Sequence, residues 1–328
     1  MAPSAPAHGV AAGKSLGLAR HFLVIGAQRS GTSWLYRNLN RHPDFWLAPV
    51  KEIHFFDRSP QYATPSHHAL PPGWRRLSVI FTPSPSQKMV RRYLKPLTWY
   101  RKAETDRWAA LWFSLSYLLS NIGPDWYRRL FMFGGDKITG DLTPGYSLLA
   151  DEDVAVAREL LPEARIVMVL RNPIERAWSN FKLNAQFYGF SLTDERAARR
   201  FFSKSAVFQR GDYASILRRW RRYFGPERFH LAYYEDLVED PETLLRSILQ
   251  FLGARSDPCP ADVYRRVNAS VPVEIPTDIR KALAQQYRDS LRELCRIEPG
   301  RAEIWLREAE HLGRGAPPRQ SAVERLRT

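Results

Sequence analysis

Short apolar runs alternate along this chain with segments in which apolar residues recur every three or four positions. Continuous apolar runs of about four to eight residues are typical of strands buried on both faces of a parallel sheet. The runs that we predict as strands are residues 21–25, 137–140, 165–170 and 229–234. Because helical segments separate them, the pattern predicts an α/β fold in which helices flank a central parallel β-sheet on both faces.

Two segments in the second half of the chain have clear helical spacing. Apolar side chains at one face of the first are Tyr213, Ile216, Leu217, Trp220 and Phe224, and those of the second are Leu244, Leu245, Ile248, Phe251 and Leu252. We interpret both stripes as core faces. The arginines between the apolar positions of the first segment, at 218, 219, 221 and 222, are expected to be solvated.

A glycine-bracketed turn follows the first predicted strand. Residues 24–35 read VIGAQRSGTSWL, so Gly26 and Gly31 bracket four residues before a predicted helix. Glycines allow a tight turn whose N–H groups face inward, and the start of the helix adds a positive dipole, so the segment suits a phosphate group. The spacing is P-loop-like except that Thr32 replaces the lysine of G-x-x-x-x-G-K-[ST], which disfavours an ordinary nucleotide triphosphatase. Arg29, inside the turn, and Ser33, beside Thr32, suit a terminal 5′-phosphate or phosphosulfate.

A second anion site is predicted where the strand at 165–170 ends. Arg171 follows this buried run directly, and Asn172 and Pro173 break it before a helix that carries Ser179. An arginine at the end of a buried strand is costly unless an anion meets it, because its charge cannot be lost by deprotonation. A phosphate-sized ligand explains the arginine and the serine together; an internal carboxylate paired with Arg171 is the alternative.

These two segments resemble the signatures of sulfotransferases that use 3′-phosphoadenosine 5′-phosphosulfate. GAQRSGTSWL looks like the loop for the 5′-phosphosulfate, and LRNPIERAWS looks like the strand-helix junction for the 3′-phosphate. A third segment, KEIHFFD at 51–57, is similar to the stretch with the catalytic glutamate in Golgi-type and bacterial carbohydrate sulfotransferases, above all the heparan sulfate 3-O type. The resemblance covers roughly residues 20–310, includes 140–146 and 211–253, and leaves 60–135 unmatched.

The resemblance implies roles for individual residues. It places catalysis on Glu52 and Arg29, to which the spacing of the segment adds His54 as a candidate; the histidine spacing indicates no metal. The resemblance implies acceptor contacts from Asp57, Thr143 and Tyr146, although Thr143 to Tyr146 also reads as an ordinary turn. The implied donor-binding residues are Gly26, Gln28, Arg29, Ser30, Gly31, Thr32, Ser33, Trp34, Arg171, Ser179 and Arg266. The family often has lysine where Arg29 stands, and a planar guanidinium is not equivalent to that point charge.

Glu52 is the candidate base for taking the proton of an acceptor hydroxyl. Its neighbours Ile53, Phe55 and Phe56 are apolar, so we expect burial to raise its pKa. In an extended segment His54 shares a face with Glu52 and can hydrogen-bond it or the acceptor, but a structural histidine fits the same pattern. Asp57 can orient a basic side chain or cap the following turn.

The charge balance favours anionic partners. Lysine and arginine total 49 and aspartate and glutamate 34, which leaves a net charge of +15. Nucleic acid is the general inference from such a charge, but the chain has no zinc-ligand spacing, RNA-binding signature or uninterrupted basic block, so we expect no nucleic-acid partner. An anionic donor, an acidic glycan or a membrane surface explains the excess, as does an arginine-rich proteome.

The predicted organisation is one domain between two disordered tails, at 1–20 and 313–328, because motifs from both halves must build one site. Residues 60–135 read as a variable insertion that suits a lid over the acceptor site. Within it, the apolar residues 108–119 are too few to span a bilayer and fit a buried helix, a lid or a membrane-surface contact. We expect a cytoplasmic protein, with peripheral membrane contact as a second interpretation.

Three functions remain open from the sequence. The leading one is a sulfotransferase that acts on a hydroxyl of a glycan, glycolipid or small alcohol. A kinase-like phosphoryl transferase that needs ATP and magnesium is disfavoured by the missing Walker lysine. A non-catalytic binder of nucleotide or anionic polymer is the third. The motifs describe the donor end of the site and leave the acceptor and the oligomeric state open.

Overall fold

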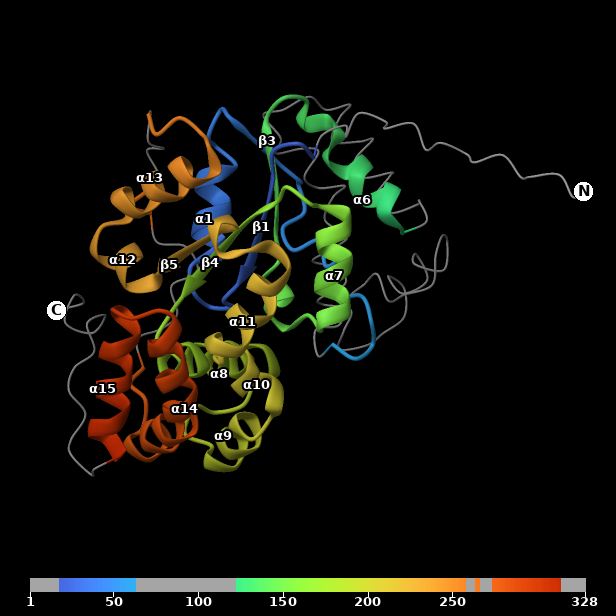
Figure 1. Cartoon of the computed structure of the whole chain (residues 1–328). Helices are drawn as coiled ribbons and strands as arrows, with labels where there is room; N and C mark the ends of the chain where they lie inside the picture. Colours follow the sequence, from blue (N-terminus) through green and yellow to red (C-terminus); the bar gives the residue numbers. More distant parts are fainter. Residues whose placement is uncertain (1–17, 63–121, 258–262, 266–272, 314–328) are drawn as a thin grey trace, which may run out of the picture.

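A computed structural model describes residues 18–62, 122–257, 263–265 and 273–313 of the chain (Figure 1). Its centre is a five-stranded sheet in which every pairing is parallel, in the order β2-β3-β1-β4-β5. The strands are β1 (His21–Gly26), β2 (Phe45–Leu47), β3 (Ile138–Leu142), β4 (Arg165–Leu170) and β5 (Phe229–Tyr233). The four predicted strands are therefore confirmed. The sequence pattern missed β2, which has only three residues.

Most of the described chain outside the sheet is helical. The α-helices are α1 (Thr32–Leu39), α6 (Pro124–Phe131), α7 (Asp151–Leu160), α8 (Pro173–Tyr188), α9 (Glu195–Phe202), α10 (Ser205–Gln209), α11 (Tyr213–Phe224), α12 (Tyr234–Glu239), α13 (Pro241–Leu252), α14 (Thr277–Ile297) and α15 (Arg301–Gly313). Short 3-10 helices are η2 (Met132–Gly134), η3 (Pro144–Leu148) and η4 (Pro226–Arg228). Helices α11 and α13 carry the two predicted apolar stripes.

Three arginines of α11 form ion pairs with carboxylates of neighbouring segments. Arg218 pairs with Glu293, Arg221 lies 2.5 Å from Glu298, and Arg222 lies 3.0 Å from Asp151. The side chains of Arg218 and Arg222 are exposed, as predicted, but α7 and α14 also bring carboxylates to this face of α11.

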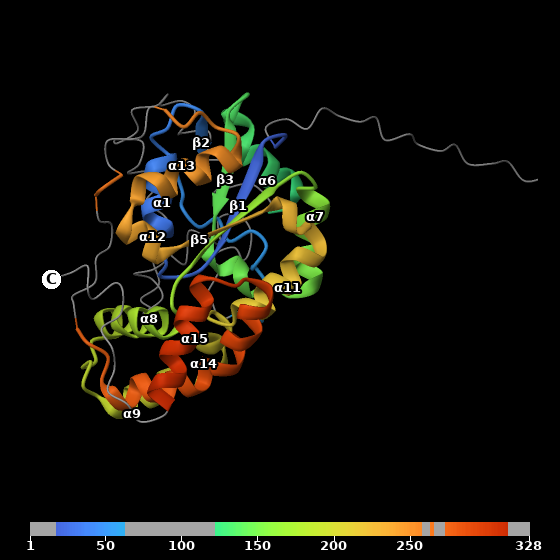
Figure 2. The same ribbon diagram turned by 60° about the vertical axis from the view of Figure 1, so that its left-hand side comes forward.

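Alternate residues of the central strands face opposite sides of the sheet and build two cores. Phe22 and Val24 pack in the layer of α1 and α13, whereas Leu23 and Ile25 pack with α6, α7 and α11. Figures 1 and 2 show these two groups of helices on the two sides of the sheet. The predicted three-layer α/β architecture with a parallel sheet covered on both faces is confirmed.

Part of the predicted insertion belongs to the main core. Helix α6 buries Trp126, Tyr127, Leu130 and Phe131 against the sheet, while residues 63–121, including the apolar stretch 108–119, lie outside the described residues. No helix within the described part has the length and apolar character that a membrane span requires.

The strand order brings the sequence motifs to one edge of the sheet. Strand β1 lies between β3 and β4, so the chain leaves it towards a crevice with a neighbouring strand on each side. The loop after β1, Thr143 after β3 and Arg171 after β4 all follow the carboxyl ends of adjacent parallel strands.

Candidate active site

The loop between β1 and α1 is held in a conformation that depends on its glycines. Gly31 has φ = 88°, and a Cβ there would lie 2.5 Å from Cδ2 of Leu237. A side chain at this position would therefore be both strained and in collision. Arg29 also has a left-handed φ of 72°, which costs energy in a residue with a side chain. Backbone strain of this kind is typical of functional loops.

Several polar groups of this loop have no partner within the described part of the chain. Ser30 Oγ is buried without a hydrogen bond. The backbone N–H groups of Gly31, Thr32 and Ser33 donate to no acceptor there, and Gly31 caps α1 without a side-chain contribution. Such donors at a helix start form an anion-binding site.

Two arginines from separate motifs meet beside this loop. Arg29 Nε donates to Ser179 Oγ at 3.1 Å, and Arg171 Nη1 donates to the carbonyl oxygen of Arg29 at 3.0 Å. Burial, and then the nearby charge of Arg171, lower the pKa of Arg29. The guanidinium of Arg171 lies 4.3 Å from the ring centroid of Tyr234.

No ion pair satisfies Arg171 within the residues that the model places. Its Nε is buried without a hydrogen-bond partner. Glu235 is buried nearby, but its Oε1 accepts from the N–H of Asn172 at 3.3 Å and from Nε1 of Trp305 at 3.2 Å. Burial raises the pKa of Glu235 and the charge of Arg171 lowers it, so Arg171 has a carboxylate nearby. Among the described residues it forms no direct ion pair, and its Nε is a donor without a partner.

A second group of side chains lies on the segment 51–57. Lys51 Nζ donates to Glu52 Oε1 at 2.6 Å, and Glu52 Oε2 lies 3.6 Å from Nε2 of His54. The other ring nitrogen of His54 contacts Asp57 Oδ2 at 2.7 Å. Glu52 and His54 have left-handed φ values of 67° and 57°, so the backbone is not the extended segment we assumed. Their side chains nevertheless converge, with Glu52 one-third exposed and the other two buried.

The pKa values of this group differ from the sequence expectation. Burial alone would raise the pKa of Glu52, but the charge of Lys51 and the contact with His54 outweigh it and hold that pKa below its ordinary value. The expected rise was wrong because it ignored these two cations. Burial opposes the charge of His54, yet the hydrogen bond to Asp57 and the nearby carboxylate of Glu52 raise its pKa to about 10. The imidazole ring of His54 thus lies between the carboxyl groups of Glu52 and Asp57.

A buried aspartate at the end of β3 supports the same segment. Asp141 accepts hydrogen bonds from Thr143 Oγ1 at 2.6 Å and from the hydroxyl of Tyr146 at 2.7 Å. The Tyr146 hydroxyl in turn accepts from the N–H of Phe55 at 2.9 Å. Thr143 and Tyr146 are fully buried, so both hydroxyls serve this support rather than face an open acceptor site. Burial raises the pKa of Asp141 to about 6 against the hydrogen bonds that lower it.

Helix η3 connects the loop after β1 to the segment 51–57. A Cβ on Gly145 would lie 2.6 Å from Asp57 Oδ2 and 3.4 Å from Cε1 of His54. A Cβ on Gly26 would lie 3.2 Å from Cβ of Ser147, two residues further along. The two groups of candidate residues are thus packed against the same short helix.

The remaining predicted residues vary in position. Gln28 and Ser33 lie in the loop and the first turn of α1, partly exposed. Trp34 turns away, and its Nε1 donates to the carbonyl oxygen of Val263 at 2.7 Å. Arg266 lies outside the described residues. Sequence reasoning missed Lys51 and Asp141, although a charged residue beside the glutamate and an acid at the end of a buried strand were visible signals. Within the described ranges, no group of three His, Cys, Asp or Glu side chains is placed to hold a metal ion.

Comparisons with known proteins agree on one family. The model of the sulfotransferase family matches residues 22–258. Human bifunctional heparan sulfate N-deacetylase/N-sulfotransferase 2 is 30% identical over 146 residues, which cover 40% of this chain and 16% of the relative. Mouse heparan sulfate glucosamine 3-O-sulfotransferase 3B1 is 25% identical over 240 residues, or 71% of this chain and 46% of the relative. The chain thus spans about half or less of these curated relatives.

The fold has a solved counterpart. The crystal structure of a sulfotransferase from Alicyclobacillus acidocaldarius superimposes with a TM-score of 0.60 and 22% identity, covering 87% of this chain and 97% of the other. At this identity the likeness shows the fold.

Proposed function

Because this chain belongs to the sulfotransferase family, we propose that it transfers a sulfuryl group from 3′-phosphoadenosine 5′-phosphosulfate to a hydroxyl group of a carbohydrate or glycolipid. The observation that supports this donor is that Arg29 and Arg171 lie side by side. Burial, and then the charge of Arg171, lower the pKa of Arg29, and neither arginine has an ion pair within the described residues. An anion of the donor's size and charge would relieve this repulsion.

The polar groups of the site fit such a donor. The unused N–H groups of Gly31 to Ser33 and the buried Oγ of Ser30 suit the 5′-phosphosulfate. Arg171 Nε and the hydroxyl of Ser179, which already accepts from Arg29, suit the 3′-phosphate. The model gives no support for Trp34 as a direct contact, because its indole N–H is used elsewhere.

The reaction assigns separate tasks to the two groups of residues. As the acceptor oxygen bonds to sulfur, its proton passes to Glu52, and the bond between sulfur and the 5′-phosphate oxygen breaks. Arg29 and the loop N–H groups stabilise the negative charge that develops on that phosphate. The charge of Lys51 and the contact with His54 outweigh burial and lower the pKa of Glu52, so Glu52 is in the ionised form that can receive the proton.

The proposed acceptor is inferred from the relatives of this chain. The names of the curated relatives refer to heparan sulfate, which supports a carbohydrate hydroxyl as the acceptor of this chain. A cytoplasmic location and a peripheral membrane contact stay predictions.

The test is transfer of radiolabelled sulfuryl from the donor to a mixture of glycan acceptors. Turnover without added metal is expected in the wild type, and Glu52→Gln should lower it about 10²–10⁴-fold with little loss of donor binding. Glu227→Gln is the matched control, because its carboxylate is exposed and distant along the chain. Wild-type turnover in Glu52→Gln would remove Glu52 from the mechanism. Phosphoryl transfer from ATP with magnesium, in place of sulfuryl transfer, would overturn the proposal.

A further inference from the structure

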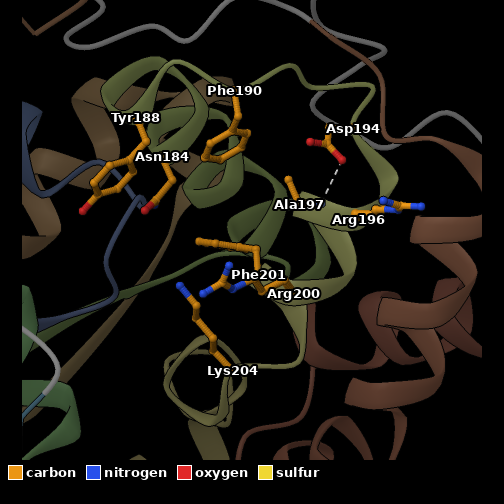
Figure 3. A pocket seen from close by; sticks show the side chains of 9 residues that line it. All are labelled: Asn184, Tyr188, Phe190, Asp194, Arg196, Ala197, Arg200, Phe201 and Lys204. Atoms are coloured by element: carbon orange, nitrogen blue, oxygen red, sulfur yellow. Dashed lines mark hydrogen bonds between the residues drawn. The ribbon is translucent and has the colours of Figure 1, made fainter.

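A hollow of about 540 Å³ opens between the end of α8 and helix α9, outside the candidate active site. The lining residues on which the argument depends are Asn184, Tyr188, Phe190, Arg200, Phe201 and Lys204. Figure 3 shows the nitrogen atoms of Arg200 and Lys204 on the same side of this space as the polar ends of Asn184 and Tyr188, whereas Arg196 points away. The hollow therefore combines two cations, an amide and aromatic rings.

The cations of this hollow lack compensation. No ion pair joins Arg200 or Lys204 to a carboxylate in the part of the chain that the structure describes. The carboxylate at the edge of the hollow, Asp194, caps α9 by accepting from the N–H of Ala197 at 3.0 Å. The arginines of α11, by contrast, pair with Glu293, Glu298 and Asp151. Unbalanced charge at a concave surface favours an anionic ligand.

The aromatic walls add a second kind of contact. Tyr188 is 75% exposed at the end of α8, which is unusual for so large an aromatic side chain. Phe201 is buried beneath the cations, with Lys204 Nζ 5.7 Å from its ring centroid. An exposed ring beside two cations suits a ligand that has an apolar ring face as well as negative charge.

Helices α8 and α10 connect the hollow to residues beside the candidate active site. Asn184 follows Ser179 by five residues on α8, which is about 7.5 Å along the helix axis. Helix α10 connects Lys204 to Arg210, whose pKa is lowered by burial and by the charge of Arg176 against the opposing charge of Asp57. Arg176 of α8 holds α10 in place by donating to the carbonyl oxygen of Val207 at 2.7 Å.

We propose that this hollow is an acceptor subsite that binds an acidic sugar unit, with its carboxylate or sulfate on Arg200 and Lys204 and its ring against Tyr188. This inference rests on the proposed function and narrows its acceptor to an acidic saccharide rather than a neutral alcohol. The subsite makes no contact with the donor loop, so the binding of donor and acceptor are separable.

The test uses calorimetric titration with a heparin-derived hexasaccharide. The double variant Arg200→Gln/Lys204→Gln should bind it about tenfold more weakly or worse, and with a shallower salt dependence. The matched control is Arg218→Gln/Arg222→Gln on α11, which removes the same charge elsewhere and should bind like the wild type. Tyr188→Ala should lower the affinity for the hexasaccharide, although it leaves all the cations in place. Both hollow variants should bind 3′-phosphoadenosine 5′-phosphate as the wild type does.

An equal loss of affinity for the hexasaccharide in the hollow variants and in the control variant would overturn the proposed subsite. The proposal would also be overturned if maltohexaose or a single-stranded oligonucleotide bound as tightly as the hexasaccharide. The same holds if the wild type bound no hexasaccharide. Failure of the wild type to bind 3′-phosphoadenosine 5′-phosphate would instead count against the proposed function, since that titration does not depend on the hollow.

Discussion

Replacement of Gly145 by alanine tests the packing that holds the candidate catalytic segment in place. The new Cβ would lie 2.6 Å from Asp57 Oδ2, whereas ordinary contacts begin at 3.4 Å, so the carboxylate must retreat by roughly 0.8 Å. His54 cannot follow freely, because its Cε1 already lies 3.4 Å from the same Cβ. If the carboxylate retreats along the line to His54, the contact of 2.7 Å between Asp57 and His54 lengthens to about 3.5 Å, the limit of hydrogen bonding.

We expect Gly145→Ala to lower the free energy of unfolding by about 1–3 kcal/mol, as overpacking in a core does. Turnover should fall about tenfold or more, because His54 loses the partner that fixes its ring beside Glu52. Affinity for 3′-phosphoadenosine 5′-phosphate should stay within about twofold, since the donor loop is not displaced. Urea unfolding, initial rates of sulfuryl transfer and calorimetry measure the three quantities.

The control is Gly123→Ala, where an added Cβ meets nothing within 4 Å. This variant should match the wild type in all three measurements. Wild-type stability and turnover in Gly145→Ala would refute the reasoning, because they would show that the Asp57 and His54 contact neither resists displacement nor matters for the reaction.

Three further predictions follow from the same segment. Lys51→Met removes the cation that lowers the pKa of Glu52, so the acid limb of the pH–rate profile should move to higher pH; an unmoved limb would contradict the assigned base. Tyr146→Phe leaves the buried N–H of Phe55 without its acceptor and should cost about 1–3 kcal/mol in urea unfolding, together with lower turnover; a change below about 0.5 kcal/mol would count against this support. Because the pKa of His54 is raised to about 10, its contribution to the free energy of unfolding is fully present below pH 6.5 and is lost as the pH rises through about 10. The free energy of unfolding should therefore fall over this interval, and the fall should be smaller in His54→Gln.

The parts of the fold that sequence predicts are those set by local pattern. Buried strands and amphipathic helices have their own periodicities, and these located β1, β3, β4, β5, α11 and α13. The position of Arg171 directly after a buried run also indicated its place at the carboxyl edge of the sheet. Strand β2 was missed because three residues show no period.

The parts that sequence missed depend on tertiary neighbours. The pKa of Glu52 depends on where the cations of Lys51 and His54 lie, which local hydrophobicity does not reveal. Thr143 and Tyr146 turn inward because Asp141 is buried between them, and only the folded arrangement of β3 and η3 shows this. The roles of these residues in binding and catalysis stay predictions until they are measured.

The central claim is that Arg29 and Arg171 share one anionic donor. Calorimetric titration with 3′-phosphoadenosine 5′-phosphate, without magnesium, tests it most directly when the wild type is compared with Arg171→Ala and with the exposed control Arg288→Ala. The account predicts micromolar or tighter binding that only Arg171→Ala weakens, by about 1.5–3 kcal/mol, the value expected for a charge-assisted hydrogen bond. Absence of binding by well-folded wild type, or equal binding by Arg171→Ala, would contradict it.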